Sequence, residues 1–399
     1  MSSSEADGAC RNLRIVDFTW VLAGPYATRI LADFGAEVIK VQSRETQGAE
    51  ETNLTGYFNT WNRNKLGITL NLSKPAGVEI AKTLIMASDV VVENFTPRVM
   101  DNWGLDYSSM SQEKPDLIML SMSGMGHTGP WRNFATFGPT IQAFCGLTHL
   151  TTFPGQPPMG LGYSYADHIA GLMAALAILE ALEYRHKTGK GQFIDLSEFE
   201  AMCTLLGVPI LDYAVNQTNP TPVGNGPTYC LAAPHNVYRC LGDDRWCAIC
   251  VFTENEWQNF CHAIGNPSWT RDSRFTTLSK RQENAAELDA LIEEWTTQHV
   301  AEDIMMVLQQ AGVAAGIVQD ARDLSRDPQL NHRGFFTDIM HPVLGHMITD
   351  GTPIKLSSTP AKLAKPAPLI GQDNDYVYRQ VVGLSEEEIT HYKQECIFD

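Results

Sequence analysis

The sequence predicts an α/β protein in which a Rossmann-like large domain is combined with a smaller α+β domain. Three observations favour this class: the chain opens with a strand, helix and strand, nearly continuous apolar strands follow, and the composition changes after Asn216 to the stretch TNPTPVGNGPTY. Such apolar strands are typical of a parallel sheet that helices cover on both faces. We expect a large domain over 1–220, a small domain over 225–325, and an extended return segment with the C-terminal part of the large domain over 326–399.

The opening unit has the pattern of a βαβ motif. A strand at Leu13–Phe18 leads into a helix that starts near Pro25 and stops before Gly35, and a second strand follows at Glu37–Val41. Proline is well suited to a first helical turn, and glycine often ends a helix. The unit lacks a GxGxxG sequence, and Gln42 stands where an acidic residue would hold a ribose, so we do not expect NAD binding.

The next elements extend the same sheet. We predict a strand at Gly67–Asn71, a helix from Pro75 to Ala87, and strands at Asp89–Val92 and Leu117–Ser121. The glycine-rich stretch Met122–Pro130 is then a loop at the carboxyl end of a strand, where open α/β sheets bind their ligands.

A long helix follows from Asp167 and ends at Gly189 after the basic residues Arg185, His186 and Lys187, and a strand is expected at Gln192–Leu196. Its apolar residues recur at helical spacing, which predicts a largely buried helix. Two interpretations of Asp167 stay open. It is either an N-cap or a nucleophile, and the glycines around it, which let a ligand approach the backbone closely, favour the second: Gly160, Gly162 and Gly171.

The small domain opens with a β-hairpin, His235–Cys240 and Arg245–Phe252. Cys247 and Cys250 form a CxxC pair inside the second strand, where residues three apart face opposite sides, so we interpret them as core residues rather than as a zinc or redox site. The remaining elements are helices at 254–264, 284–298 and 301–311, a strand at 315–318, strands within 335–358 and a terminal helix at 386–394.

Composition excludes several classes of protein. The net charge of −17 over 399 residues argues against a nucleic-acid partner, which would require a basic surface. We find no run of about 18 apolar residues and no secretion signal, and nine irregularly spaced cysteines indicate reduced thiols, so a cytoplasmic protein without a membrane segment is expected. The basic residues available to an anionic ligand are Lys40, Arg44, Arg63, Lys65 and Arg98.

Several segments together resemble the class III CoA-transferases, the family of formyl-CoA transferase and carnitine CoA-transferase. They lie in unbroken order at 14–41, 66–95, 166–201, 233–246 and 368–377. The resemblance implies that Asp167 is the catalytic aspartate. Its carboxylate would attack an acyl-CoA thioester, form a mixed anhydride and then an aspartyl-CoA thioester, and pass CoA to an acceptor acid. It implies a CoA thioester as substrate and neither a metal nor a permanently bound cofactor.

The resemblance also implies a CoA-binding site, carried over position by position. The matching residues are Val21, Leu22, Ala23, Ser43, Arg44, Leu70, Asn94, Phe95, Arg98 and Asn102. In the alternative interpretation, the apolar members are core residues, the arginines are surface charges, and Asn94 bonds its own turn. The helix that begins after Gly24 offers free N–H groups to a phosphate or an acyl oxygen.

Departures from formyl-CoA transferase predict a less polar acyl pocket. Trp20 and Leu22 replace a histidine and a glutamine, and Ala135 and Phe137 replace a lysine and a tyrosine. We therefore expect an acid that is larger than oxalate and partly apolar or aromatic. The resemblance to benzylsuccinate CoA-transferase within the family implies succinyl-CoA as donor and an aromatic or branched dicarboxylate, such as benzylsuccinate, as acceptor.

Two other functions stay open. One is an acyl-CoA racemase or isomerase of the same superfamily, for which His127 or His168 would have to replace the histidine that such racemases carry at 135–137. The other is a non-catalytic subunit, against which Asp167 argues. The resemblance further implies an interlocked homodimer or heterodimer of ring-like chains, and we expect 202–235 and 320–365 to be extended.

Overall fold

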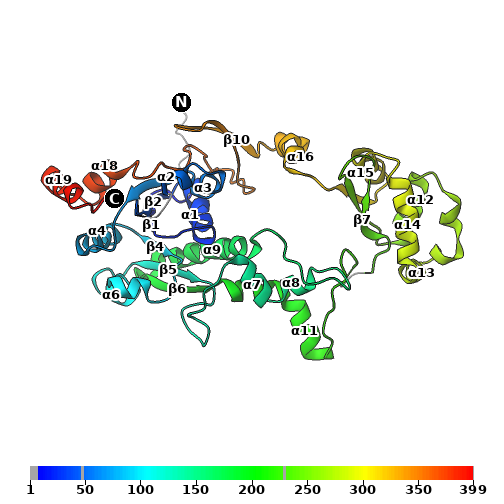
Figure 1. Cartoon of the computed structure of the whole chain (residues 1–399), viewed down its shortest axis with the longest axis horizontal. Coiled ribbons are helices and arrows are strands. Elements are labelled where there is room, and N and C mark those ends of the chain that lie inside the picture. Colours follow the sequence, from blue (N-terminus) through cyan, green and yellow to red (C-terminus); the bar gives the residue numbers. More distant parts are fainter. Residues whose placement is uncertain (1–7, 46–48, 228–230, 399) are drawn as a thin grey trace. The chain divides into compact units, whose positions relative to one another are not determined.

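The computed structural model describes residues 8–45, 49–227 and 231–398 (Figure 1). Contacts within the chain define two compact units. The first combines Met1–Thr148, Gly160–Asn219 and Gln329–Asp399, and the second combines His149–Met159 with Pro220–Pro328. The segment before the long helix, His149–Met159, therefore groups with the second unit, which the expected division at 220 and 225 did not anticipate.

The first unit is built on a parallel sheet of six strands. Val16 of β1 pairs with Ile39 of β2 on one side and with Val91 of β4 on the other, so the strand order reverses its direction at β1 and β4. This is the order of a doubly wound Rossmann fold, in which ligands bind at the reversal. In sheet order the strands are β3 (Leu66–Thr69), β2 (Glu37–Gln42), β1 (Arg14–Asp17), β4 (Val90–Glu93), β5 (Ile118–Ser123) and β6 (Gln192–Ser197).

All six strands were predicted, with differences only at their ends. The largest differences are at β3, which ends two residues earlier at Thr69, and at β5, which continues to Ser123 and so takes in the first residues of the expected loop. Every residue of β3, β4 and β5 is buried. This confirms the inference from their apolar composition that the sheet is covered on both faces.

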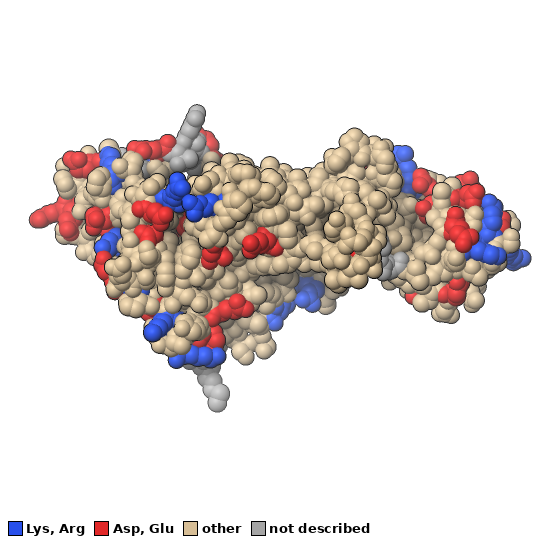
Figure 2. Space-filling model, turned by 90° about the horizontal axis from the view of Figure 1, so that it is seen from below, with Lys and Arg blue, Asp and Glu red and all other residues tan. Residues whose placement is uncertain are grey.

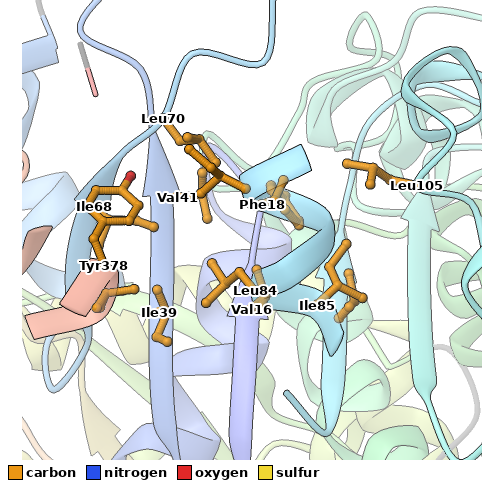
Figure 3. Close-up of a cluster of buried hydrophobic side chains, with 14 of the residues drawn as sticks. Val16, Phe18, Ile39, Val41, Ile68, Leu70, Leu84, Ile85, Leu105 and Tyr378 are labelled. Carbon is orange, nitrogen blue, oxygen red and sulfur yellow. The ribbon is translucent and has the colours of Figure 1, made fainter. Parts of the chain in front are cut away.

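Alternate residues of the strands form two separate cores. On one face Val16, Ile39 and Ile68 pack with Leu84 of α4 (Pro75–Met86) and with Tyr378 near the C-terminus (Figure 3). Each fully buried aliphatic side chain contributes about 1.5–3 kcal/mol through removal from water. On the other face the strand residues pack against α1 (Ala23–Asp33) and α9 (Tyr165–Thr188): Ile15, Val38, Val90, Val92, Ile118 and Leu120.

The buried face of α9 is made of small residues. A side-chain carbon at Gly171 would lie 2.8 Å from the carbonyl oxygen of Ala23, so glycine here permits close packing of α9 on α1. The prediction of a largely buried helix was only partly right, because Leu172, Leu176 and Leu179 are 47%, 57% and 46% exposed. The predicted end is confirmed: Gly189 has φ +73° and follows a basic last turn.

By length and hydropathy, α9 is the one helix of the described chain that could cross a membrane, contrary to the expectation that none could. One side of it is buried against α1 and the sheet. Its apolar composition therefore serves the core on that side.

Short helices fill most of the other connections of the first unit. The segment 202–235, expected to be extended, instead begins with helix. It contains the end of α10, a single 3₁₀ turn and α11 (Gly207–Asn216), and α11 buries none of its residues in this chain. The further helices are α2 (Ala49–Asn53), α3 (Gly56–Asn62), α5 (Val99–Trp103), α6 (Tyr107–Glu113), α7 (Gly138–Phe144), α10 (Glu198–Cys203), α11 (Gly207–Asn216), α18 (Asn374–Tyr376) and α19 (Glu386–Gln394).

The segment 320–365 is likewise not extended throughout. It contains the helices α16 (Ala321–Arg326) and α17 (Pro328–His332) and the antiparallel pair β10 (Phe336–His341) and β11 (Gly345–Asp350). The pair matches the strands predicted within 335–358. Single-turn elements complete the described chain: α8 (Leu147–Leu150), η1 (Thr204–Leu206), η2 (Ser268–Arg271), η3 (Ser273–Phe275) and the π-helical η4 (Val377–Val381).

The second unit confirms the predicted hairpin and adds a third antiparallel strand to it. Cys247 is buried in the core of this unit, whereas Cys250 faces the other side and is partly exposed, as predicted for a CxxC pair on a strand. Its elements are β7 (His235–Arg239), β8 (Trp246–Cys250), β9 (Ala314–Ile317), α12 (Glu254–Ala263), α13 (Leu278–Glu283), α14 (Ala285–Thr296) and α15 (Ala301–Gln310).

The surface reflects the acidic composition. Figure 2 shows basic side chains in small groups beside acidic ones on one face of the molecule. Binding of an anionic ligand would therefore depend on particular basic side chains rather than on the electrostatic field of the whole protein.

Candidate active site

The loops after β1 and β4 meet at the point where the strand order reverses. The side chain of Asn94 holds them together: its Oδ1 accepts a hydrogen bond from the Trp20 N–H at 2.9 Å, and its Nδ2 donates to the Trp20 carbonyl at 3.0 Å. The alternative interpretation of Asn94, a bond to its own turn, is therefore wrong. Asn94 fixes the backbone of the loop that leads into α1.

That loop contains a strained residue. Val21 has φ +63°, a left-handed conformation that is an outlier for a β-branched side chain, and it is 41% exposed. Such conformations persist where the surroundings impose them, and they cluster at ligand sites. Leu22 and Ala23 follow as buried residues, Leu22 as the N-cap of α1 and Ala23 as its first residue.

Asp167 lies in the first turn of α9 and points toward the start of α1. The N-cap of α9 is Ser164, so the interpretation of Asp167 as an N-cap is wrong. Its carboxylate accepts hydrogen bonds from the Ser164 hydroxyl and from the backbone N–H of Ala23. The helix terminus expected to bind a ligand anion thus donates first to this carboxylate. Burial raises the pKa of Asp167 to about 6, and the backbone N–H groups of Asp167 and Ala23 oppose the rise.

Gly138 packs directly on this carboxylate, which the sequence analysis did not anticipate. A side-chain carbon at Gly138 would lie 1.7 Å from Ser164 Oγ and 2.3 Å from Asp167 Oδ2. Glycine is therefore required at the start of α7. By contrast, Gly160 and Gly162 have open space around them, and Gly171 serves helix packing instead of ligand approach.

Two cavities meet at this place. The smaller, about 340 Å³, contains Asp167 and is here called the Asp167 cavity; the larger, about 600 Å³, lies over the ends of β1, β2 and β3 and is called the β1–β3 cavity. Trp20, Val21 and Phe95 line both. Both volumes lie in the range of small-molecule sites, and the shared residues make them neighbouring compartments.

The predicted binding residues fall into three groups. Ser43 and Leu70 line the β1–β3 cavity, Asn94 lines the Asp167 cavity, and Val21 and Phe95 line both. Leu22 and Ala23 are buried behind the cavity walls. The third group is exposed and lines neither cavity: Arg44, Arg98 and Asn102.

Two charged residues of the Asp167 cavity were missed from the sequence. Arg132 is exposed there after the glycine-rich loop, and no described ion pair engages it. Glu198 is only 7% exposed, and burial together with the charge of Asp167 raises its pKa to about 8. The signal for Glu198 was its position two residues after the predicted strand Gln192–Leu196, at the edge of the sheet where ligands bind.

Beneath the β1 loop lies a buried charge cluster. Asp17 Oδ2 is 2.9 Å from Lys65 Nζ, and its Oδ1 is 3.3 Å from Lys40 Nζ. Burial by itself would raise the pKa of Asp17, but the positive charges of the two lysines hold it well below its usual value. Burial has the opposite effect on Lys65 and lowers its pKa to about 7. Lys65 is thus paired with Asp17, and Arg63 Nη2 lies 2.7 Å from Asp33 Oδ2. Neither residue is therefore the free cation that we expected to bind an anionic ligand.

Neither histidine considered for a racemase lines the Asp167 cavity. His127 Nε2 lies 3.6 Å from Glu93 Oε1, and burial lowers the pKa of His127. His168 packs among aromatic rings and contacts Tyr163. The described residues also contain no group of three or more His, Cys, Asp or Glu that could hold a metal ion.

Fold and site define an enzyme of the doubly wound α/β class with a half-buried carboxylate where two cavities meet. A family model described as CoA-transferase family III matches residues 11–374, and the chain belongs to this family. The resemblance inferred from the sequence is therefore confirmed, and the protein is a class III CoA-transferase that uses CoA thioesters as substrates.

Relatives match nearly the whole length of the chain. The chain is 33% identical over 396 residues to a succinyl-CoA–D-citramalate CoA-transferase of Chloroflexus aurantiacus, which covers 98% of both chains. It is 30% identical over 394 residues to the alpha subunit of a succinyl-CoA–L-malate CoA-transferase of the same organism, which covers 96% of this chain and 91% of that one. The crystal structure of a CAIB/BAIF family protein from Brucella suis superposes with a TM-score of 0.87 at 31% identity, which covers 94% of this chain and 100% of that one.

Proposed function

We propose that the enzyme moves CoA from succinyl-CoA to a second dicarboxylic acid through covalent intermediates on Asp167. The observation that carries this proposal is the position of the Asp167 carboxylate in a cavity that adjoins a larger one over the sheet edge. At pH 7 a carboxylate with a pKa of about 6 is mostly ionised, and it is partly desolvated and so more reactive than one in water.

The steps balance without a net proton. An Asp167 oxygen attacks the thioester carbonyl, and the CoA thiolate leaves as a mixed anhydride forms. The thiolate then attacks the aspartyl carbonyl, which releases the donor acid and leaves an aspartyl-CoA thioester. The acceptor carboxylate repeats the two exchanges in reverse. The Ala23 N–H, already directed at Asp167, would stabilise the oxyanions on the aspartyl carbon.

The β1–β3 cavity is the proposed CoA site. Ser43, Leu70 and Phe95 line it. Because the cavity adjoins the Asp167 cavity, the thiol end of CoA would reach the Asp167 carboxylate. Arg44 and Arg98, exposed after β2 and β4, are the proposed contacts of the CoA phosphates.

The Asp167 cavity supports a dicarboxylate as the acyl group. Arg132 can bind the carboxylate that does not react, and the aromatic rings of Phe134 and Phe137 line the same space. The named relatives that use succinyl-CoA act on citramalate and malate, both dicarboxylic acids. An acceptor with an apolar substituent, as in benzylsuccinate, suits the aromatic lining.

Trapping of the intermediate tests this function. The protein is incubated with succinyl-CoA, quenched with hydroxylamine or borohydride, and digested for mass spectrometry. The peptide that contains Asp167 is expected to carry the modification, and no other carboxylate should do so. If a panel of acyl-CoA thioesters including succinyl-CoA leaves Asp167 unmodified, the chain does not act alone as this transferase.

Arg132→Gln is expected to raise the KM for a dicarboxylate acceptor about 10- to 100-fold, because one charge-assisted hydrogen bond is lost. The KM for a monocarboxylate of similar size should change little. Steady-state kinetics with matched pairs of acids measure this. The control is Arg11→Gln, an exposed residue outside both cavities. An equal effect of Arg132→Gln on both acids would refute the selection of dicarboxylates.

We further propose that the enzyme works as a dimer, with a second copy or a related chain. Support comes from apolar side chains that the described chain leaves exposed on two helices: Leu172, Leu176 and Leu179 on α9, and Val208, Ile210, Leu211 and Tyr213 on α11. Sedimentation equilibrium of the chain alone is expected to give twice the chain mass if the partner is a second copy. A monomer at micromolar concentration would exclude the second copy and require a related chain as partner.

A further inference from the structure

Glu198 is a buried carboxyl that the transfer steps above do not use. It begins α10 directly after Ser197, the last residue of β6, and its side chain lines the Asp167 cavity. Only 7% of the residue is exposed, and the described structure gives its carboxyl neither a hydrogen bond nor an ion pair. Its oxygens are not among the fully buried side-chain atoms that lack a partner, so they are open to the cavity and available to a ligand.

The surroundings keep Glu198 neutral at pH 7. Burial and the nearby Asp167 raise its pKa to about 8, above that of Asp167, so Asp167 ionises first and Glu198 retains its proton. Charged or titratable groups on the elements packed against α10 include Asp167 at the start of α9, Asp195 on β6 and Cys145 after α7. Glu200 and Cys203 lie on α10 itself, and Arg132 lines the shared cavity. Only Asp167 among them influences the pKa of Glu198.

We propose that protonated Glu198 donates a hydrogen bond to a carboxylate of the bound acid and so holds it beside Asp167. The inference takes one element from the proposed function, namely that the acid bound in the Asp167 cavity is a dicarboxylate. A second carboxylate ion in the cavity would repel both substrates, whereas a carboxylic acid is a strong donor to a carboxylate. With Arg132 on one carboxylate and Glu198 on the other, a dicarboxylate has a partner for each end.

Succinate binding measured by calorimetry tests the proposal without turnover. Above pH 8 the wild type must take up about one proton to bind succinate, which titrations in buffers of different ionisation enthalpy detect. Its affinity should fall about 10-fold between pH 7 and pH 9, because the neutral acid becomes the minor form. In Glu198→Gln, whose amide still donates, affinity at pH 7 should stay within about 3-fold of the wild type, with no proton uptake and no fall at pH 9.

Glu200→Gln is the matched control, since Glu200 is exposed on the same helix, and it should behave as the wild type. Thermal unfolding separates binding from folding. Folding raises the pKa of Glu198, so the wild type loses stability as pH rises from the unfolded pKa through about 8, and Glu198→Gln should be about as stable as the wild type at pH 4 and more stable at pH 7 and pH 9. Proton uptake that persists in Glu198→Gln, or failure of the wild type to bind succinate at either pH, would overturn the inference. Trapping on Asp167 is a separate readout, so the proposed function can fail or hold independently.

Discussion

Asp167→Asn is expected to lower kcat/KM for CoA transfer by at least about 10⁴-fold, as loss of a covalent nucleophile does in other enzymes. The amide has the size of the carboxylate and can keep the Ala23 N–H bond to its oxygen, but it cannot form the anhydride. Chromatography of the CoA products measures the rate, and the trapped modification should disappear in parallel.

The same variant should be more stable than the wild type at neutral pH. The folded pKa of Asp167 lies above its unfolded value, so its contribution to stability is full at low pH and is lost as pH rises through about 6. Asn removes this loss, and the free energy of unfolding at pH 8 should rise by about 1–3 kcal/mol, with little difference at pH 3. Asp167→Glu, which keeps the charge but moves it, should lose activity without this gain. A variant with Asn that keeps its rate, or that is destabilised at pH 8, contradicts the role of Asp167.

Asp17→Asn is expected to reduce the free energy of unfolding by about 3–5 kcal/mol, because it leaves two buried lysines without their counterion. Asp17 is fully buried and accepts from Lys65, Lys40 and the Thr28 hydroxyl at 2.7 Å. Asparagine preserves the shape, so the loss reports the charge. Urea unfolding at pH 7, followed by circular dichroism, measures it.

The matched control is Asp116→Asn, which breaks a surface pair with Lys114 at 3.4 Å. An exposed pair contributes about 0–1 kcal/mol, so this variant should unfold near the wild type. If Asp17→Asn proves no more destabilising than Asp116→Asn, the buried cluster does not support the β1 loop as inferred.

The sheet could be predicted because its evidence is local. Each strand carries its own apolar run, and the turns carry glycine or proline, so the six strands and the C-terminal helix α19 were found from short windows of sequence. The helices α3, α7 and α10 were missed because they are too short for a periodic pattern. The exposed leucines of α9 were missed because a helix that is apolar on all sides does not indicate which side the core covers.

Part of the site could also be predicted, because the evidence for those residues is local in the sequence. Asp167 stood within a long matching segment. Ser43, Asn94 and Phe95 each followed a predicted strand, and Leu70 lay near the end of one. Arg132, Gly138 and Glu198 belong to the same cavity or touch its carboxylate, yet they are far apart in sequence and carry no motif. They meet because parallel strands end at one edge of the sheet, which brings the loops after them together.

By itself, then, the sequence determined the fold class, the family and the residue proposed as nucleophile, since these depend on patterns within continuous segments. Tertiary structure alone decided the pairing of Asp17 with Lys40 and Lys65, the strained conformation of Val21, and the raised pKa values of Asp167 and Glu198. The physical reason is that a pKa or a backbone conformation of this kind depends on burial and on charges from distant segments, and both exist only once the chain has folded.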